Sequence, residues 1–284
     1  MSDSCKSCAS AGSCTTDSCS SAPQKTPAQK MSRVKKVIAV MSGKGGVGKS
    51  SVTGMLAVSL MRQGFNVGIL DADITGPSIP KVFGLTGKAG ASQGGIIPQK
   101  SRDGIKIMSL NLMVESEDDP VILRGPLIAQ VVTQFWTDVI WGDLDYLLLD
   151  MPPGTGDVAI TIFQSLPMDG SIMVTSPQDL ANMVVRKAVN MVRKYDPPIY
   201  GLIENMAYVQ CTECEKRMEI FGKPKGEEAA KRNGIPFLGE LPIDPRLPEL
   251  SDAGRIEDYH SPAFDKIALR LAEEIKAADN KKLA

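Results

Sequence analysis

The chain of 284 residues contains a single histidine, His260, and few aromatic residues. One histidine cannot form a histidine metal cluster, so acid–base chemistry has to depend on carboxylates, lysines or water. Aromatic residues make up 5 % of the sequence, too few for the stacking platforms that bind single-stranded nucleic acid. The net charge of −1 indicates no basic surface overall, so we expect neither nucleic acid nor a membrane as a partner.

The chain also has no long apolar run. None of its uninterrupted apolar segments approaches the roughly 18 residues of a membrane span. The first residues are polar and rich in cysteine, without the apolar core of a secretory signal. We therefore expect a cytoplasmic protein, in which thiols stay reduced and more often bind metal than form disulfides.

Composition divides the chain into two parts. Residues 1–32 have no hydrophobic periodicity, and we expect a Cys-rich tail that is disordered without a ligand. In residues 33–284, short apolar runs alternate with helical patterns, which predicts one α/β domain with a doubly wound, mostly parallel sheet. The expected strands are 37–41, 67–70, 105–110, 146–150, 171–175, 199–204 and 236–241; the expected helices are 50–62, 126–141, 180–194 and 262–278, with a hairpin within 89–104.

A glycine-rich segment follows the first expected strand and fits G-x-x-x-x-G-K-[ST] in full. Such a loop wraps a phosphate with its backbone N–H groups, and the following helix directs its positive end at the anion. In this motif Lys49 contacts the β- and γ-phosphates and Ser50 offers its hydroxyl to Mg²⁺. Lys44 is either a solvated loop charge or a second phosphate contact, to a neighbouring subunit's nucleotide. The predicted ATP-binding residues are Gly43, Lys44, Gly45, Gly46, Val47, Gly48, Lys49 and Ser50.

Carboxylates follow two of the expected strands. Active sites of open α/β sheets lie at the carboxyl ends of strands. Asp150 ends a strongly apolar strand, in the position of a carboxylate that holds Mg²⁺. Asp73 and Asp157 are candidates to orient the attacking water; as alternatives, each is a turn or helix-capping aspartate.

The body of the chain has one cysteine pair, Cys211 and Cys214. Two thiolates supply half of a tetrahedral site or of an iron–sulfur cluster, so the other ligands have to come from the tail or from a second subunit. A redox dithiol and an inert pair are the alternatives, and zinc is an alternative to iron. The tail carries Cys5, Cys8, Cys14 and Cys19, a possible second cluster site or an adventitious metal-binding tail.

Five segments of the sequence, in this order along the chain, resemble those of one protein family. Through residues 35–275 the chain resembles the Mrp family of iron–sulfur cluster carrier ATPases, including its eukaryotic cytosolic scaffold branch, within the MinD-like deviant P-loop group. The tail stretch from Cys5 to Cys14 is similar to part of the N-terminal cluster motif of the scaffold branch, but the far-upstream first cysteine of that motif is absent and Cys19 lies downstream instead. The segments that carry the resemblance are 43–50, 70–78, 150–157, 204–206 and 211–214.

The resemblance implies a homodimeric ATPase that uses ATP and Mg²⁺ and passes a [4Fe–4S] cluster to apo iron–sulfur proteins. It implies that Lys44 reaches the partner's nucleotide and that Asn205 contacts adenine, with Asp244 nearby. Cys211 and Cys214 would then hold a cluster shared between two subunits. Two other functions fit the same nucleotide site: a positioning ATPase like MinD or ParA, and an ATP-dependent electron-transfer protein.

Overall fold

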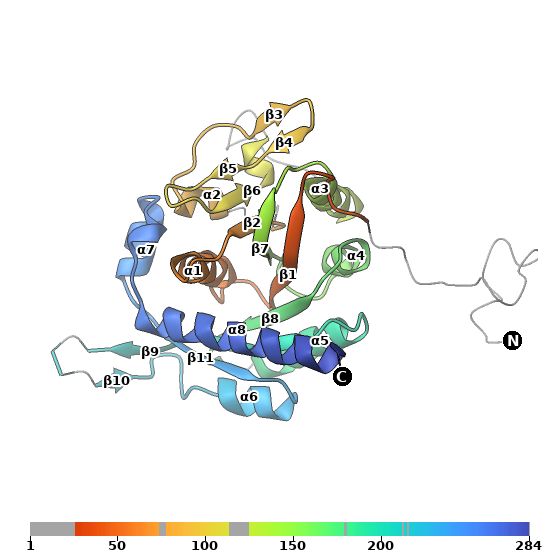
Figure 1. Ribbon diagram of the computed structural model, residues 1–284. Coiled ribbons are helices and arrows are strands. Elements are labelled where there is room, and N and C mark those ends of the chain that lie inside the picture. The colour runs from red at the N-terminus through yellow and green to blue at the C-terminus, as the bar shows by residue number, and fades with distance from the viewer. Residues whose placement is uncertain are drawn as a thin grey trace, which may run out of the picture.

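A computed structural model describes residues 26–73, 78–113, 125–178, 181–211, 213–214 and 216–283. In these residues a nine-stranded sheet lies between two layers of helices (Figure 1). The strand order is β10-β9-β8-β1-β7-β2-β6-β5, and β11, outside this order, also pairs with β9. The pairings are parallel except those of β5 with β6 and β10 with β9, which confirms the predicted doubly wound, mostly parallel sheet.

The strands are short except for β1, β7 and β9. The antiparallel pair β3 and β4 forms a separate hairpin inside the predicted 89–104 segment. The strand bounds are β1 Arg33–Ser42, β2 Val67–Asp71, β3 Gly90–Ser92, β4 Gly95–Ile97, β5 Gln99–Lys100, β6 Lys106–Met108, β7 Asp143–Asp150, β8 Gly170–Thr175, β9 Ile199–Gln210, β10 Arg217–Met218 and β11 Phe237–Pro242.

The helices divide between the two faces of the sheet. No helix in the described part of the chain has both the length and the apolar character that crossing a membrane demands. The helix bounds are α1 Lys49–Arg62, α2 Ile79–Val82, α3 Gly125–Thr137, α4 Asp157–Ser165, α5 Ala181–Arg193, α6 Gly226–Arg232, α7 Arg246–Asp252 and α8 Pro262–Leu283, with 3₁₀ turns η2 Leu110–Leu112 and η3 Ile256–Asp258.

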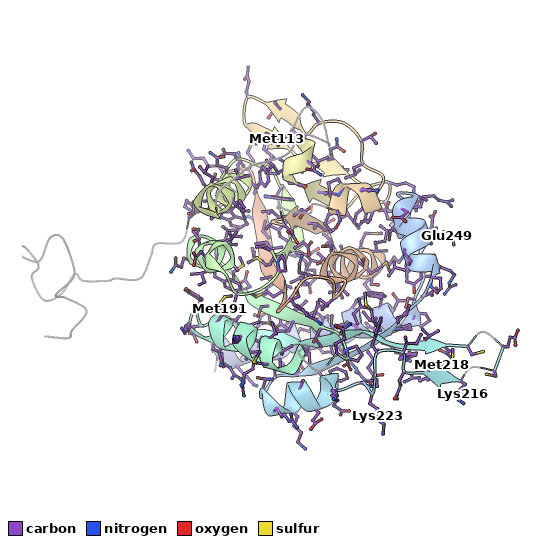
Figure 2. The ribbon with its side chains drawn as sticks, turned by 180° about the vertical axis from the view of Figure 1, so that it is seen from behind. Met113, Met191, Lys216, Met218, Lys223 and Glu249 are labelled. Carbon is purple, nitrogen blue, oxygen red and sulfur yellow. The ribbon has the colours of Figure 1, made fainter. Side chains whose placement is uncertain are left out.

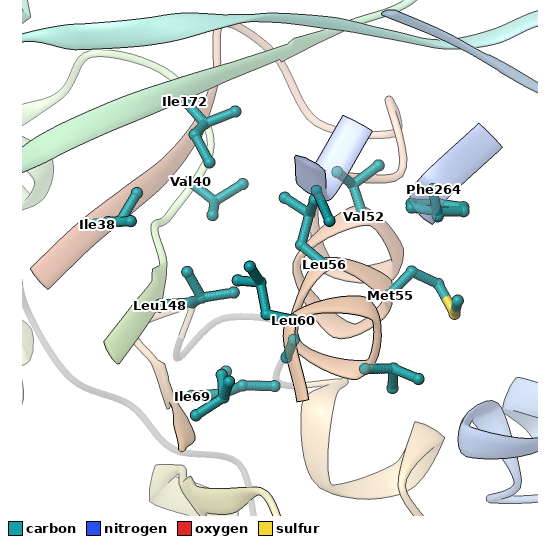
Figure 3. Packing of buried hydrophobic residues seen from close by; sticks show 14 of the residues in the cluster. Ile38, Val40, Val52, Met55, Leu56, Leu60, Ile69, Leu148, Ile172 and Phe264 are labelled. Carbon is teal, nitrogen blue, oxygen red and sulfur yellow. The ribbon is translucent and has the colours of Figure 1, made fainter. Parts of the chain in front are cut away.

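Each face of the sheet has its own apolar core, because successive side chains of a strand point to opposite faces. From β1, Ala39 and Met41 pack with α3, α4 and α5, whereas Ile38 and Val40 pack with α1 and α8. Figure 3 shows the second core, where Leu56 of α1 lies against the sheet. Because both faces are covered, the central strands are continuous apolar runs, the pattern from which they were predicted.

One predicted helix is wrong in its extent. The segment 126–141 was expected to be helical throughout, but α3 ends at Thr137. Val139 instead forms an isolated parallel bridge with Ile96, and Trp141 is fully buried with its indole N–H donating to the carbonyl of Phe135. The apolar residues after Thr137 therefore serve long-range packing, which helical periodicity cannot separate from a longer helix.

The last residues of the expected tail contact the body. The backbone N–H of Thr26 donates to the carbonyl of Ser165 at the end of α4, at 3.0 Å. The indole N–H of Trp136 donates to the carbonyl of Thr26 at 2.9 Å, and the amide of Gln29 donates to the carbonyl of Gly94. Residues 26–32 are thus tied to α3, α4 and the β3–β4 hairpin ahead of β1.

Candidate nucleotide and thiol sites

The glycine-rich loop connects the carboxyl end of β1 to α1, as the motif predicts. Gly46 and Gly48 have φ of 79° and 76°, in the left-handed region that favours glycine. Gly48 is the residue that precedes the first turn of α1, so the loop turns sharply into the helix there. The N-terminal end of α1, with its unpaired N–H groups and positive dipole, faces the loop.

The glycines of this loop answer two different needs. A Cβ on Gly43 would collide with Val184 of α5, and one on Gly48 would collide with the amide of Asn205. A Cβ on Gly45 or Gly46 would meet nothing within 4 Å. Packing therefore requires glycine at the two outer positions, while the middle of the loop faces open space that an anion can approach.

Lys49 and Asp150 form the centre of the site. Lys49 Nζ lies 2.7 Å from Asp150 Oδ1, and both side chains are nearly buried. The hydroxyl of Ser50 donates to Asp150 Oδ2 at 2.5 Å, and that of Thr53 donates to Oδ1 at 2.8 Å. The predicted Mg²⁺ residues Ser50 and Asp150 are therefore in direct contact, an oxygen pair of the kind that Mg²⁺ accepts.

Two further carboxylates lie beside this pair. Asp71 ends β2 in register with Asp150 and is 1 % exposed. Its carboxylate accepts from the hydroxyl of Ser109 and from the backbone N–H of Asp73, both at 3.1 Å. Burial raises the pKa of Asp71 well above its ordinary value, the charge of Asp150 raises it further, and Lys49 lowers it. Asp73 Oδ2 lies 3.7 Å from Lys49 Nζ, so it belongs to the same cluster.

The remaining predicted nucleotide residues lie further out. The ammonium of Lys44 donates to the side chain of Gln178, in the loop after β8. Asp157 is exposed at the first turn of α4, and within the described residues no hydrogen bond or ion pair links its carboxylate to Lys49. A role for Asp157 with water stays a prediction.

Asn205 lies on β9 against the phosphate loop. Its amide N–H donates to the carbonyl of Val47 at 2.9 Å, and its side chain is 8 % exposed. The neighbouring Met206 has a φ of 59°, unusual for a residue other than glycine. The structure therefore places Asn205 beside the loop, while its predicted contact with adenine stays a prediction.

The cysteine pair lies on an arm that projects from the sheet, formed by the end of β9, by β10 and by the described residues between them (Figure 1). Figure 2 shows Lys216 and Met218 on this arm, beyond the rest of the body. The backbone N–H of Cys211 donates to the carbonyl of Lys216 at 3.0 Å and closes the loop. We call residues 208–225 the cysteine arm.

The cysteine arm favours a thiolate at Cys211. Backbone N–H groups of Cys214 and Glu213, and the thiol of Cys214, donate to Cys211 and lower the pKa of its thiol. A thiolate is the form that binds metal. Neither Cys211 nor Cys214 is in a disulfide, and Cys214 is exposed. In the described part of the chain, no group of three or more Cys, His, Asp or Glu side chains could hold a metal ion.

The predicted tail ligands, Cys5, Cys8, Cys14 and Cys19, lie outside the described residues. Sequence reasoning missed two contacts at the nucleotide site. Thr53 lies one helical turn after Lys49, a spacing that could have indicated its contact with Asp150. Ser109 gave no comparable signal, since only the pairing of β2 with β6 brings it close to Asp71.

Comparison with known families bears directly on this site. The family model described as the NUBPL iron-transfer P-loop NTPase, of the ParA type, matches residues 33–276. The chain belongs to this family. The match spans the phosphate loop, the Asp150 strand and the cysteine arm together.

Two curated relatives are both described as iron–sulfur cluster carrier proteins. The iron–sulfur cluster carrier protein of Clostridium perfringens is 45 % identical over 268 residues, covering 90 % of this chain and 94 % of the relative. That of Methanocaldococcus jannaschii is 45 % identical over 254 residues, covering 87 % of this chain and 88 % of the relative. This member of the iron-transfer NTPases is therefore similar to those carriers over nearly their whole length.

Solved structures agree with the fold. A nucleotide-binding protein from Archaeoglobus fulgidus, solved in complex with ADP, is 45 % identical with a TM-score of 0.74, covering 82 % of this chain and 91 % of that one. The cell-division ATPase MinD of Pyrococcus furiosus has a TM-score of 0.60 at 20 % identity, covering 86 % and 99 %. At that identity, MinD shows only that this iron-transfer NTPase has the same fold.

Proposed function

We propose that this iron-transfer NTPase hydrolyses ATP and carries a [4Fe–4S] cluster, bound at Cys211 and Cys214, to apo iron–sulfur proteins. The observation that carries the proposal is the position of both sites on one strand. Asn205 of β9 contacts the phosphate loop, and Cys211 follows the end of the same strand. The ADP complex of the A. fulgidus relative and the carrier names of the curated relatives support the two halves.

In the nucleotide half, each side chain has a chemical role that follows from its place. Lys49 would exchange part of its contact with Asp150 for the β- and γ-phosphates. Mg²⁺, when bound, offsets phosphate charge, and Ser50 and Asp150 would hold it. Asp73 lies near enough to Lys49 to orient water at the phosphate, and Asp157 is the alternative. Lys44, held by Gln178, would leave it to reach the nucleotide of a second subunit.

In the thiol half, the cargo needs ligands from more than one chain. An iron–sulfur cluster takes about four thiolates, and the described part of the chain offers Cys211 with Cys214. A second copy would supply the other pair about a two-fold axis. Three large apolar side chains are exposed on the same cysteine arm, which favours a contact with a second copy there: Met218, Ile220 and Phe221.

Anaerobic reconstitution with iron and sulfide tests the cluster site. The comparison uses the full chain with Cys5, Cys8, Cys14 and Cys19 changed to Ser, with and without Cys211→Ala. We expect the tail variant to bind cluster, by absorbance and by iron and sulfide content, and the added Cys211→Ala to abolish that binding. Equal cluster content in both proteins would overturn the assignment of the site. Intact chain and tail variant with equal iron content would exclude a tail cluster.

A further inference from the structure

Glu204 is a buried carboxylate that neither the nucleotide chemistry nor the thiols account for. It is 1 % exposed at the point where β9 passes the carboxyl edge of the sheet. Its two oxygens accept from the backbone N–H groups of Lys225 and Gly226, each at 2.9 Å. Those two residues are where the chain returns from the cysteine arm and begins α6. Glu204 therefore joins the strand that leads into the arm to the segment that leads out of it.

Packing makes this junction tight. A Cβ on Gly226 would lie 2.7 Å from Cβ of Glu204 and 2.8 Å from its Oε2. Glycine at this position lets the backbone approach the carboxylate closely enough for both hydrogen bonds. Burial raises the pKa of Glu204, while the two N–H groups lower it.

A second carboxylate contacts the arm from the neighbouring strand. Glu240 of β11 is the register partner of Glu204, and its Oε2 lies 3.5 Å from the guanidinium of Arg217 on β10. Arg217 also stacks over the ring of Tyr208, 4.1 Å from its centroid. Glu204 thus binds the arm where it returns to the body, and Glu240 makes a weaker, exposed ion pair with its strand β10.

The residue after Glu204 contacts the nucleotide loop. Asn205 donates to the carbonyl of Val47, next to Gly48. From Asn205 to Cys211 there are six residues of strand, about 20 Å at the rise of an extended chain. Tyr208 pairs with Pro242 of β11, and Val209 and Gln210 pair with β10, so strand pairing covers the part of this route nearest the thiols.

We propose that Glu204 is a positioning residue that locks the base of the cysteine arm to β9, so that nucleotide binding changes the reactivity of Cys211 and Cys214. The inference rests on the proposed function in taking those thiols as the cargo site. Asn205 would sense the phosphate loop, and the Glu204 junction would convert the resulting shift of β9 into movement of the arm. Without the junction, the arm and the loop would respond independently.

Thiol alkylation in the full-length, reduced, cluster-free chain tests the proposal. The rates at which iodoacetamide modifies Cys211 and Cys214 are measured by peptide mass spectrometry, without nucleotide and with Mg-ADP at saturation for each variant. Typical coupling energies predict that nucleotide changes the intact chain's rate about five-fold or more. In Glu204→Gln we expect the rate with Mg-ADP to be nearly equal to the rate without nucleotide, so that their ratio is close to one. Glu228→Gln, an exposed position on α6, is the matched control and should keep the ratio of the intact chain.

Gly226→Ala approaches the same junction from the other side and decides the matter if Glu204→Gln does not fold. Its Cβ would push α6 away from the carboxylate, so it too should lose the nucleotide dependence. A folded junction variant that keeps the ratio of the intact chain would overturn the proposal. So would an intact chain whose thiols react equally fast with and without Mg-ADP. Neither result concerns cluster binding, which the reconstitution of Cys211→Ala decides separately.

Discussion

Lys49 and Asp150 form an ion pair of 2.7 Å in which the lysine side chain is 6 % exposed and the aspartate 1 %. Asp150 also accepts from Ser50 and Thr53, and the buried Asp71 lies beside it. One ammonium therefore compensates a group of carboxylates that are largely removed from water. Such a pair makes the protein sensitive to the loss of one partner, since the remaining charge stays buried.

Lys49→Ala should therefore weaken the fold as well as nucleotide binding. We expect the free energy of unfolding without nucleotide to fall by about 3 kcal/mol, the usual effect of leaving a buried charge unpaired. Urea unfolding followed by circular dichroism measures it. Lys35→Ala is the matched control, because Lys35 pairs with Asp145 at the surface and should change stability little. An unchanged Lys49→Ala midpoint would mean that water reaches the carboxylates.

Two glycines of the phosphate loop should differ in whether their substitution affects stability or ADP binding. Gly48→Ala would combine a left-handed φ with a collision against Asn205, and should lower stability by at least roughly 1–2 kcal/mol. Gly45→Ala has neither problem and should leave the unfolding midpoint unchanged. If phosphate approaches this side of the loop, Gly45→Ala should still weaken ADP binding in calorimetry. Unchanged ADP affinity in folded Gly45→Ala would mean that the phosphate does not bind on the side of the loop that Gly45 faces.

The nucleotide site was more predictable from sequence than the cysteine arm. The phosphate loop depends on local geometry, so its motif predicted the roles of Lys49 and Ser50. The apolar strand that ends in Asp150 predicted the carboxylate that contacts both of them. The strand expected at 199–204 continues to Gln210, because its later residues pair with β10 and β11, which no local pattern encodes. Glu204 lies in one of the segments that carry the family resemblance, but its hydrogen bond to Gly226 joins residues 22 positions apart, which no local pattern predicts.

Lys44→Ala should separate nucleotide binding from hydrolysis. Within the described residues Lys44 contacts Gln178 and not the Lys49–Asp150 pair, so we expect ADP affinity to stay nearly unchanged. A cation supplied to the phosphoryl-transfer transition state accelerates it about a thousandfold or more. Phosphate release should therefore fall by that order in Lys44→Ala, and should persist in Gln178→Ala. Equal hydrolysis by Lys44→Ala and the intact chain would make Lys44 a solvated loop charge.

Asp244 anchors the turn before α7, and its effect on stability should depend on pH. The guanidinium of Arg246 binds its carboxylate, and Tyr259 donates to it at 2.9 Å. Arg246 above all, with Tyr259 adding to the effect, holds the pKa of Asp244 below its ordinary value of 3.8, whereas burial opposes them.

A carboxyl whose pKa is lowered by folding stabilises the protein above its unfolded pKa and loses that contribution as the pH falls through its folded pKa. Asp244→Asn should therefore be less stable than the intact chain at neutral pH, and the difference should shrink as the pH falls below about 4. Urea midpoints across this range measure the difference, with Asp252→Asn on exposed α7 surface as the control. A stability difference that stays constant with pH would contradict this prediction, because it would mean that the charge of Asp244 contributes nothing to stability.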